Sequence, residues 1–378
     1  MKLLKLKVLS DYKMLKKGFE INFLTKTRVN KNSDNDDLIE LEPGFYYPVE
    51  TAFVGKNSSG KTTTLSFIRT VMYFLRSGRI SSDFLIEQFK FSFECLFYYD
   101  KTIYKYYGEF EKNELVNRDY LIIKDEMLQK AIYRKNYTKD LSNANFKKDE
   151  QFVPNINGDT SSISKKRLID FSISIDTLEG DETSLFIIGN RIDEIYGKEV
   201  FKTLINMFDD SIEYIKKTKG NNDNAECIFK RINKPEKYVD FSYLRNHLSA
   251  GTYRGLYLFA ASILAFNYGG TILIDEIERS FNKNLIENLF MLFRDKRINK
   301  KGASIIYSTH YAELLDTSDR CDNINVLHRN GDSITVNNMH SSYKVRTDLS
   351  KSSQFEQNAF DNHINYEKLM DLRRNLIK

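Results

Sequence analysis

The segment VETAFVGKNSSGKTTTLSFI, residues 49–68, constrains the fold of this chain more than any other. Apolar and branched residues around 49–54 predict a buried strand. Apolar residues at helical spacing predict a helix from about 61 to 76. Between the two lies a G-x-x-x-x-G-K-T pattern at 55–62, in the strand–loop–helix setting that a phosphate-binding loop of this type requires.

The residue types in this loop suit the phosphates of a nucleotide. Gly55 and Gly60 permit backbone conformations in which successive N–H groups surround an anion at a helix N-terminus. Lys61 is expected to reach the β- and γ-phosphates, and the Thr62 hydroxyl to ligate Mg²⁺. The predicted nucleotide-binding residues are Gly55, Lys56, Asn57, Ser58, Ser59, Gly60, Lys61, Thr62 and Thr63.

A second strand ends in two carboxylates. The segment TILIDEIE, residues 271–278, begins with four apolar or branched residues and then presents Asp275 and Glu276. At the carboxyl end of a parallel sheet, these acids would face the glycine-rich loop. Asp275 is therefore expected to hold Mg²⁺, directly or through water, and Glu276 to act as the general base for an attacking water.

Strands alternating with helices predict an α/β fold whose central sheet is mixed and largely parallel, with antiparallel strands at the N-terminus. The middle of the chain is less regular, although apolar spacing predicts one helix over about 198–217. We expect a first part of the core at 1–111, a mainly helical insertion at 112–240, a second part of the core at 241–345 and a C-terminal helical tail at 346–378.

Composition restricts the setting of the protein. No apolar run approaches 18 residues, and the N-terminus MKLLKLKVLSDYKM lacks the apolar centre of a signal peptide, so we expect a cytoplasmic protein without a membrane span. Three widely spaced cysteines predict reduced thiols rather than a disulfide framework. The net charge of +5 is too small to indicate nucleic-acid binding by itself.

The segment LSAGT, residues 248–252, combines an N-cap serine, Ser249, with Gly251, which allows a ligand to approach the backbone closely. Ser249 precedes Asp275 by 26 residues, enough for one helix and one strand. In these motifs the chain resembles the ABC-type ATPases, whose signature is written LSGGQ in transporters and LSxGT in many soluble members. The family's switch histidine is matched by His310 in SIIYSTH, 34 residues after Glu276.

The N-terminal KLKVLSDYKMLKKGFEINF resembles the opening strands of RecF- and SMC-type ATPases, which implies that Lys13 approaches a phosphate. The chain is most similar to compact prokaryotic RecF-like ATPases grouped as putative AAA-type ATP-binding proteins, many of them in anti-phage or abortive-infection systems. The resemblance covers roughly 1–110 and 240–350. It departs from the family pattern at Thr252, where transporters have Gln, and it leaves only Gln88 and, more weakly, Gln151 for the Q-loop glutamine.

The resemblance implies an ABC-type ATPase head that binds ATP and Mg²⁺. Two heads would join head-to-tail around ATP as a homodimer or a higher oligomer, with Ser249 and the Gly251 backbone acting on ATP held by the other chain. Hydrolysis would involve Glu276, His310 and Lys61. Because 68 residues follow His310, too few for a fused nuclease, an effector such as a nuclease or toxin is expected on a separate chain.

Three functions remain open at this point. The first is the ATPase or sensor subunit of an anti-phage defence system. The second is a RecF-like DNA-binding ATPase in DNA repair, which leaves DNA as a second partner. The third, a transporter's nucleotide-binding subunit, is disfavoured because such subunits carry LSGGQ and lack an insertion of more than about 100 residues between loop and signature. The sequence does not show which trigger a sensor subunit of this kind would detect.

Overall fold

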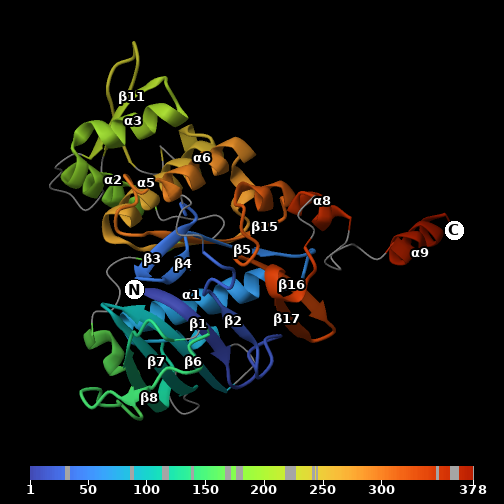
Figure 1. The fold of residues 1–378 in the computed structure, drawn as a ribbon. Coiled ribbons are helices and arrows are strands. Elements are labelled where there is room, and N and C mark those ends of the chain that lie inside the picture. The colour runs from blue at the N-terminus through green and yellow to red at the C-terminus, as the bar shows by residue number, and fades with distance from the viewer. Residues whose placement is uncertain are drawn as a thin grey trace.

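The computed structural model describes residues 1–29, 35–85, 89–112, 119–137, 140–166, 172–175, 182–217, 227–240, 243, 246–345, 349–357 and 366–377. Two six-stranded sheets form the body of the molecule, with helix α1 (Lys61–Ser77) beside both (Figure 1). One sheet is largely parallel and the other is antiparallel. The expected α/β fold with a mixed, largely parallel central sheet is confirmed.

The central sheet has the strand order β10-β14-β15-β5-β16-β17. All neighbouring pairs are parallel except β16 and β17, which form an antiparallel hairpin at the edge. Strands β5, β14 and β15 are fully buried and consist mainly of apolar residues, as strands covered on both faces must be. Their bounds are β5 Glu50–Val54, β10 Ser172–Ile175, β14 Thr271–Ile274, β15 Ser304–Thr309, β16 Ile324–Asn330 and β17 Ser333–Asn338.

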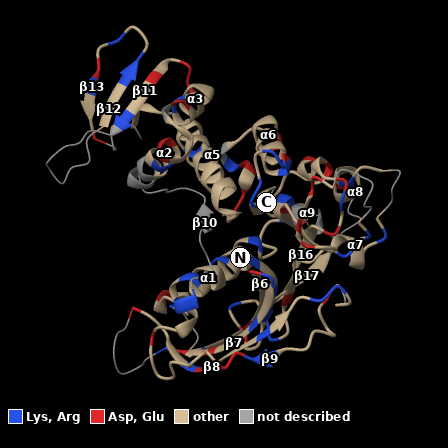
Figure 2. Cartoon of the chain, turned by 60° about the vertical axis from the view of Figure 1, so that its left-hand side comes forward, with Lys and Arg blue, Asp and Glu red and all other residues tan. Residues whose placement is uncertain are grey.

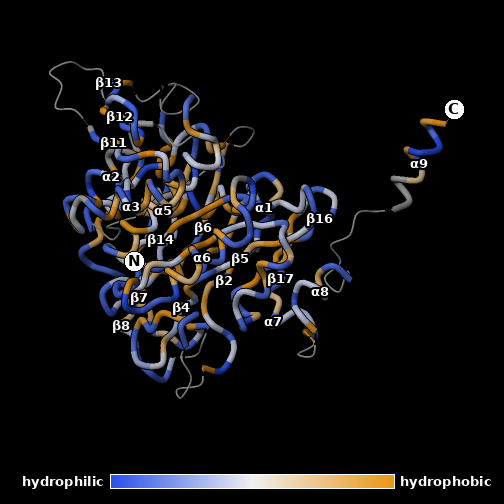
Figure 3. The backbone as a smooth tube through the Cα atoms, turned by 90° about the horizontal axis from the view of Figure 1, so that it is seen from above, coloured by the Kyte–Doolittle hydropathy of each residue, from blue (hydrophilic) through white to orange (hydrophobic). Residues whose placement is uncertain are grey.

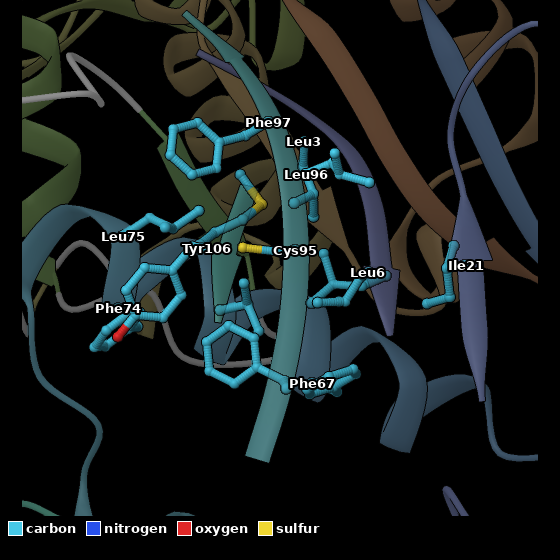
Figure 4. Close-up of a cluster of buried hydrophobic side chains, with 14 of the residues drawn as sticks. Leu3, Leu6, Ile21, Phe67, Phe74, Leu75, Cys95, Leu96, Phe97 and Tyr106 are labelled. Carbon is cyan, nitrogen blue, oxygen red and sulfur yellow. The ribbon is translucent and has the colours of Figure 1, made fainter. Parts of the chain in front are cut away.

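The second sheet contains the N-terminal strands and has the order β2-β1-β6-β7-β8-β9. Its core against α1 is rich in aromatic rings, as Figure 4 shows for Phe67, Phe74, Phe97 and Tyr106 around Cys95. The bounds are β1 Lys2–Val8, β2 Glu20–Asn22, β6 Lys90–Tyr99, β7 Thr102–Glu111, β8 Ile122–Ile132 and β9 Lys147–Lys148. A small separate hairpin is formed by β3 Leu38–Glu42 and β4 Phe45–Pro48.

Helices α5 and α6 contribute to the other hydrophobic cluster, together with residues of the central sheet. Helices α2 and α3 contact α5 and extend this cluster outward. A three-stranded antiparallel sheet, β11-β12-β13, lies beyond them (Figure 1). The bounds are α2 Glu182–Tyr196, α3 Lys198–Phe208, β11 Ile212–Lys217, β12 Cys227–Arg231, β13 Lys237–Val239, α5 Ala250–Tyr268 and α6 Lys283–Arg294.

The segment 112–240, expected as a mostly helical insertion, is instead built of strands as well as helices. Strand β8 extends the antiparallel sheet, and β10 joins the edge of the central sheet, so the segment is part of both. The helix expected over 198–217 ends at Phe208. A β-bulge between Ile212 and Tyr214 places Ile212 and Ile215 on the same buried face, which imitates helical spacing.

The C-terminal part follows the hairpin β16–β17. It contains the short helices α7 Met339–Ser342 and α8 Lys351–Glu356 and the helix α9 Tyr366–Leu376. Helix α9 lies apart from the body of the molecule in Figures 1 and 3. Within the described ranges, no helix has the length and apolar character needed to cross a membrane.

Candidate functional site

The glycine-rich loop connects β5 to α1 at the carboxyl end of the central sheet's parallel strands. Gly55 has a φ of 153° and Gly60, the N-cap of α1, has a φ of 99°. A Cβ on Gly55 would lie 2.6 Å from the Leu327 carbonyl oxygen, and a Cβ on Gly60 would collide with the Ile334 side chain. Both positions therefore require glycine, which keeps the loop backbone close to β16 and β17.

The side chain of Lys61 folds back across the loop. Its Nζ donates hydrogen bonds to the carbonyl oxygens of Gly55 at 2.9 Å and Lys56 at 3.1 Å, and it lies 3.5 Å from His310 Nδ1. Lys61 is only 5% exposed. Burial lowers the pKa of its ammonium to about 8, although carboxylates nearby, chiefly that of Asp275, oppose the shift. The ammonium is thus held at the loop and partly desolvated.

One serine holds the Asp275 carboxylate and the Glu276 backbone after β14. Ser308, on the adjacent parallel strand β15, donates a hydrogen bond from its Oγ to Asp275 Oδ1 at 2.5 Å. The same Oγ accepts a hydrogen bond from the Glu276 N–H at 2.7 Å. Glu276 has a φ of 49°, a conformation that non-glycine residues adopt rarely. Ser308 therefore fixes both the Asp275 carboxylate and the strained backbone of Glu276.

His310 follows the end of β15 and is held by its backbone. Its N–H donates to Glu278 Oε1 at 2.6 Å, and its Nε2 lies 3.9 Å from Glu276 Oε1. The pKa of His310 is lowered, first by burial and then by the positive charge of Lys61. A neutral imidazole consequently lies between the ammonium and the acid at neutral pH.

One cavity of about 500 Å³ unites most of the predicted residues. It is lined by Asn57, Ser58, Ser59, Gly60, Lys61, Thr62, Thr63, Glu276 and His310, and also by Met14 and Arg329. Gly55 and Lys56 contact Lys61 through their carbonyls, and Asp275 is linked to Glu276 through Ser308. Among the described residues, the buried Ser59 hydroxyl has no hydrogen-bond partner.

Sequence reasoning missed four residues of this site: Ser308, Glu278, Met14 and Arg329. Ser308 stands two residues before His310 in the segment STH, and Glu278 stands two residues after Glu276. Ser308 and Glu278 stand next to the predicted motifs in the sequence, but their roles depend on the pairing of β14 with β15. Met14 and Arg329 come from segments far from the loop in sequence, and no signal marked them.

Other predicted residues lie elsewhere in the chain. Ser249 caps α5 by accepting a hydrogen bond from the Thr252 N–H at 3.0 Å, and neither Ser249 nor Gly251 lines the loop cavity. Lys13 does not line it either: its ammonium lies 5.3 Å from the centre of the Tyr12 ring, at a different cavity. Gln88 lies outside the described residues, and Gln151 is exposed beside Asp149.

The chain was compared with family models, solved structures and curated proteins. A family model described as "AAA domain, putative AbiEii toxin, Type IV TA system" matches residues 51–316. A solved structure, the SMC head domain from Thermotoga maritima, is similar with 14% sequence identity and a TM-score of 0.41, and the match covers 89% of this chain and 99% of that chain. No curated protein matches.

Proposed function

Since the chain belongs to the family of AAA domains described as putative AbiEii toxin of type IV toxin–antitoxin systems, we propose that it is a Mg²⁺-dependent ATPase of the ABC type. The observation that carries this proposal is the convergence of Lys61, Thr62, Glu276 and His310 on one cavity. The match also bears out the expected resemblance to ATP-binding proteins associated with abortive infection.

The residues of the cavity suit the phosphates of ATP. The glycine loop would let a phosphate approach its backbone closely, and the Lys61 ammonium could exchange its bonds to the loop carbonyls for bonds to phosphate oxygens. Thr62 and Asp275 would hold Mg²⁺, which proteins commonly bind with few side chains because the phosphates complete its coordination. Bound Mg²⁺ neutralises charge on the phosphates.

The roles of the remaining residues follow from their positions. Glu276 lines the cavity with its carboxylate partly exposed, and it can accept the proton of an attacking water. His310, neutral and next to Lys61, would donate a hydrogen bond to the γ-phosphate, which its position in the cavity supports. Ser308 acts through both acids as a positioning residue, since it touches neither the cavity nor a reacting atom.

We further propose that the complete site needs two copies of the chain. Ser249 and Gly251 lie at the start of α5 and contribute nothing to the loop cavity of their own chain. The helix N-terminus there carries partial positive charge, and Ser249 is exposed. The γ-phosphate of ATP bound by a second chain would be a fitting ligand for this N-terminus. ATP would therefore join two heads, and its hydrolysis would release them.

Such a cycle can regulate a partner. A change between joined and separate heads is a change in quaternary state, which can switch the activity of an effector on another chain. We propose that this effector is a toxin or nuclease and that the ATPase is the sensor subunit of an anti-phage defence system. The family description, which names a toxin and a type IV toxin–antitoxin system, supports this direction.

DNA binding remains the alternative function, and one surface favours it. The register of β11, β12 and β13 places Tyr214, Lys216, Ile228, Lys230 and Tyr238 on the face opposite the buried Phe229. Figure 2 shows Lys and Arg along these strands. Exposed aromatic and basic side chains on a sheet can bind a nucleic-acid strand. A steep fall of DNA affinity with rising salt would support this function. The slope of log affinity against log salt concentration should then decrease in magnitude by about one for each lysine removed.

The ATPase proposal is tested by steady-state hydrolysis. The purified chain should release phosphate from ATP with Mg²⁺ and lose this activity when the metal is chelated. Lys61→Ala should reduce turnover by about a hundredfold or more, because the phosphates lose a desolvated cation. Turnover that persists without Mg²⁺, or that is unaffected in Lys61→Ala, would contradict the proposal.

The pKa of Lys61 predicts a pH dependence of ATP affinity. Because its pKa is lowered to about 8, the ligand-free ammonium should lose its proton as pH rises through that value, and we expect ATP to bind the charged form. The affinity should therefore be level below this pH and fall above it, by up to about tenfold per pH unit. Lys61→Arg stays charged over this range and should give a flatter profile between pH 7 and 9.5. Equal slopes for both proteins would refute the assignment.

A further inference from the structure

A second cavity of about 500 Å³ lies along the solvent-facing flank of α1. Its walls come from the N-terminal segment, α1 and the 3-10 helix η1 (Ser82–Phe84). The apolar part of its lining includes Tyr12, Met72 and Phe84, each less than 10% exposed. The cavity is comparable in size to sites that bind small molecules.

The cavity is lined by more positive than negative charge. Among the residues that the structure describes, Lys13, Arg69 and Arg76 line it together with one acid, Asp83. Arg69 and Arg76 are seven residues apart on α1, so they project on the same side of the helix. Tyr73 stands between them on the helix and is 51% exposed. Cations, an aromatic ring and an apolar wall thus meet in one place.

This cavity and the nucleotide cavity share one turn of the chain. Tyr12 and Leu15 exchange two backbone hydrogen bonds of 2.8 Å, which close a tight turn with Lys13 at a φ of 50°. Lys13 lines the cavity on α1, whereas its neighbour Met14 lines the nucleotide cavity. The residue expected to approach the ATP phosphates therefore belongs to the second cavity.

We propose that the cavity on α1 binds an organic phosphate that carries a planar ring, and that this ligand regulates ATP binding. Arginine and lysine side chains form strong, charge-assisted hydrogen bonds to phosphate. The half-exposed Tyr73 ring suits a planar ring, which would pack against it beside the buried, mutually stacked rings of Tyr12 and Phe84. Neither inorganic phosphate nor an uncharged ring alone would use both parts of the lining.

The regulatory part rests on the proposed ATPase function and on a chain of contacts. The Ile334 N–H donates a hydrogen bond of 2.9 Å to the Met14 carbonyl oxygen. The side chain of Ile334 occupies the space beside Gly60, the N-cap of the phosphate-binding helix. A ligand that shifts the Tyr12–Leu15 turn would therefore act on Met14 and, through Ile334, on the loop. By reciprocity, ATP must change the affinity for this ligand by the same factor.

Binding is tested first in the Lys61→Ala variant, so that the result does not depend on ATP hydrolysis. The dissociation constants of AMP, phenyl phosphate, inorganic phosphate and adenosine are measured by calorimetry. AMP or phenyl phosphate should bind about tenfold or more tightly than inorganic phosphate and adenosine. Tight binding of AMP alone indicates a nucleotide, and equal binding of phenyl phosphate indicates a simpler aromatic phosphate. If no probe binds better than inorganic phosphate, the proposed site is refuted.

The location is tested with surface variants. Arg69→Gln with Arg76→Gln, and separately Lys13→Asn, should each weaken binding of the preferred probe by about tenfold or more. Asparagine is chosen because it tolerates the positive φ of Lys13. Lys17→Ala removes an exposed lysine that lines neither cavity, and it should leave the affinity unchanged. Equal loss in Lys17→Ala, or no loss in the cavity variants, would overturn the assignment.

Regulation is tested in the wild-type chain by measuring ATP affinity with and without a saturating amount of the preferred probe. The expected change is about fivefold or more, and it should disappear in the Arg69→Gln, Arg76→Gln variant. Probe binding without any change in ATP affinity would refute the regulatory part. Failure of ATP hydrolysis in the wild-type chain would instead refute the proposed function and leave the binding result intact.

Discussion

Replacing Glu276 with Gln is expected to lower ATP turnover by about 10² to 10⁴-fold and to leave ATP-bound heads joined. Glutamine has the same shape as glutamate, and the hydrogen bond to Ser308 comes from the backbone N–H of residue 276, so the local geometry persists. The amide cannot accept the proton of an attacking water. ATP would therefore bind and join the heads without being consumed.

The measurement is light scattering after size-exclusion chromatography, with ATP and Mg²⁺ in the column buffer. Glu276→Gln should elute at twice the mass of the ligand-free chain and hydrolyse ATP at a trace rate. Glu287→Gln serves as the control. It removes a carboxylate on α6 that pairs with Lys283 of the same helix, and the variant should behave as the wild-type protein. A monomeric Glu276→Gln protein that still binds ATP would contradict the two-headed site.

Replacing Ser249 with Asp is expected to reduce turnover strongly while leaving the fold and ATP binding to a single chain intact. Aspartate caps a helix as well as serine does, and its charge suits the helix N-terminus, so α5 should remain stable. In the proposed dimer, however, its carboxylate would face the γ-phosphate held by the other chain. This repulsion should reduce turnover by about a hundredfold or more.

Ser249→Asn is the matched control, because asparagine has the size and capping ability of aspartate without its charge. It should retain much more activity than Ser249→Asp. The melting temperatures of both variants and their ATP affinities at low protein concentration should match the wild-type values. If Ser249→Asp hydrolysed ATP at the wild-type rate, the start of α5 would have no part in the reaction.

Much of the fold could be predicted from local patterns. The buried strands β5, β14 and β15 and the helix α1 are marked by apolar spacing and by glycines at their ends, and their order dictates a parallel sheet. The middle of the chain could not be predicted in the same way. The β-bulge near Ile212 gives a strand the apolar spacing of a helix, and β8 and β10 depend on partners distant in sequence.

In the candidate site, too, local motifs could be predicted and contacts between distant segments could not. Lys61, Thr62, Glu276 and His310 belong to contiguous motifs, and the structure brings them to one cavity. Ser308 could not be assigned, because its contact with the acids exists only through the register of β14 against β15. Lys13 was assigned to the phosphates from a motif alone, and a single tight turn places its side chain on the other side of the N-terminal segment.

The central claim is that each active site is shared between two copies of the chain, and mixing two inactive variants tests it most directly. Lys61→Ala removes the loop lysine, and Ser249→Asp disables the contact made to the other chain. In an equal mixture, half of the dimers should contain one intact site, so activity should recover to about a quarter of the wild-type value. If the mixture is no more active than the two variants measured separately and added together, the shared site is contradicted.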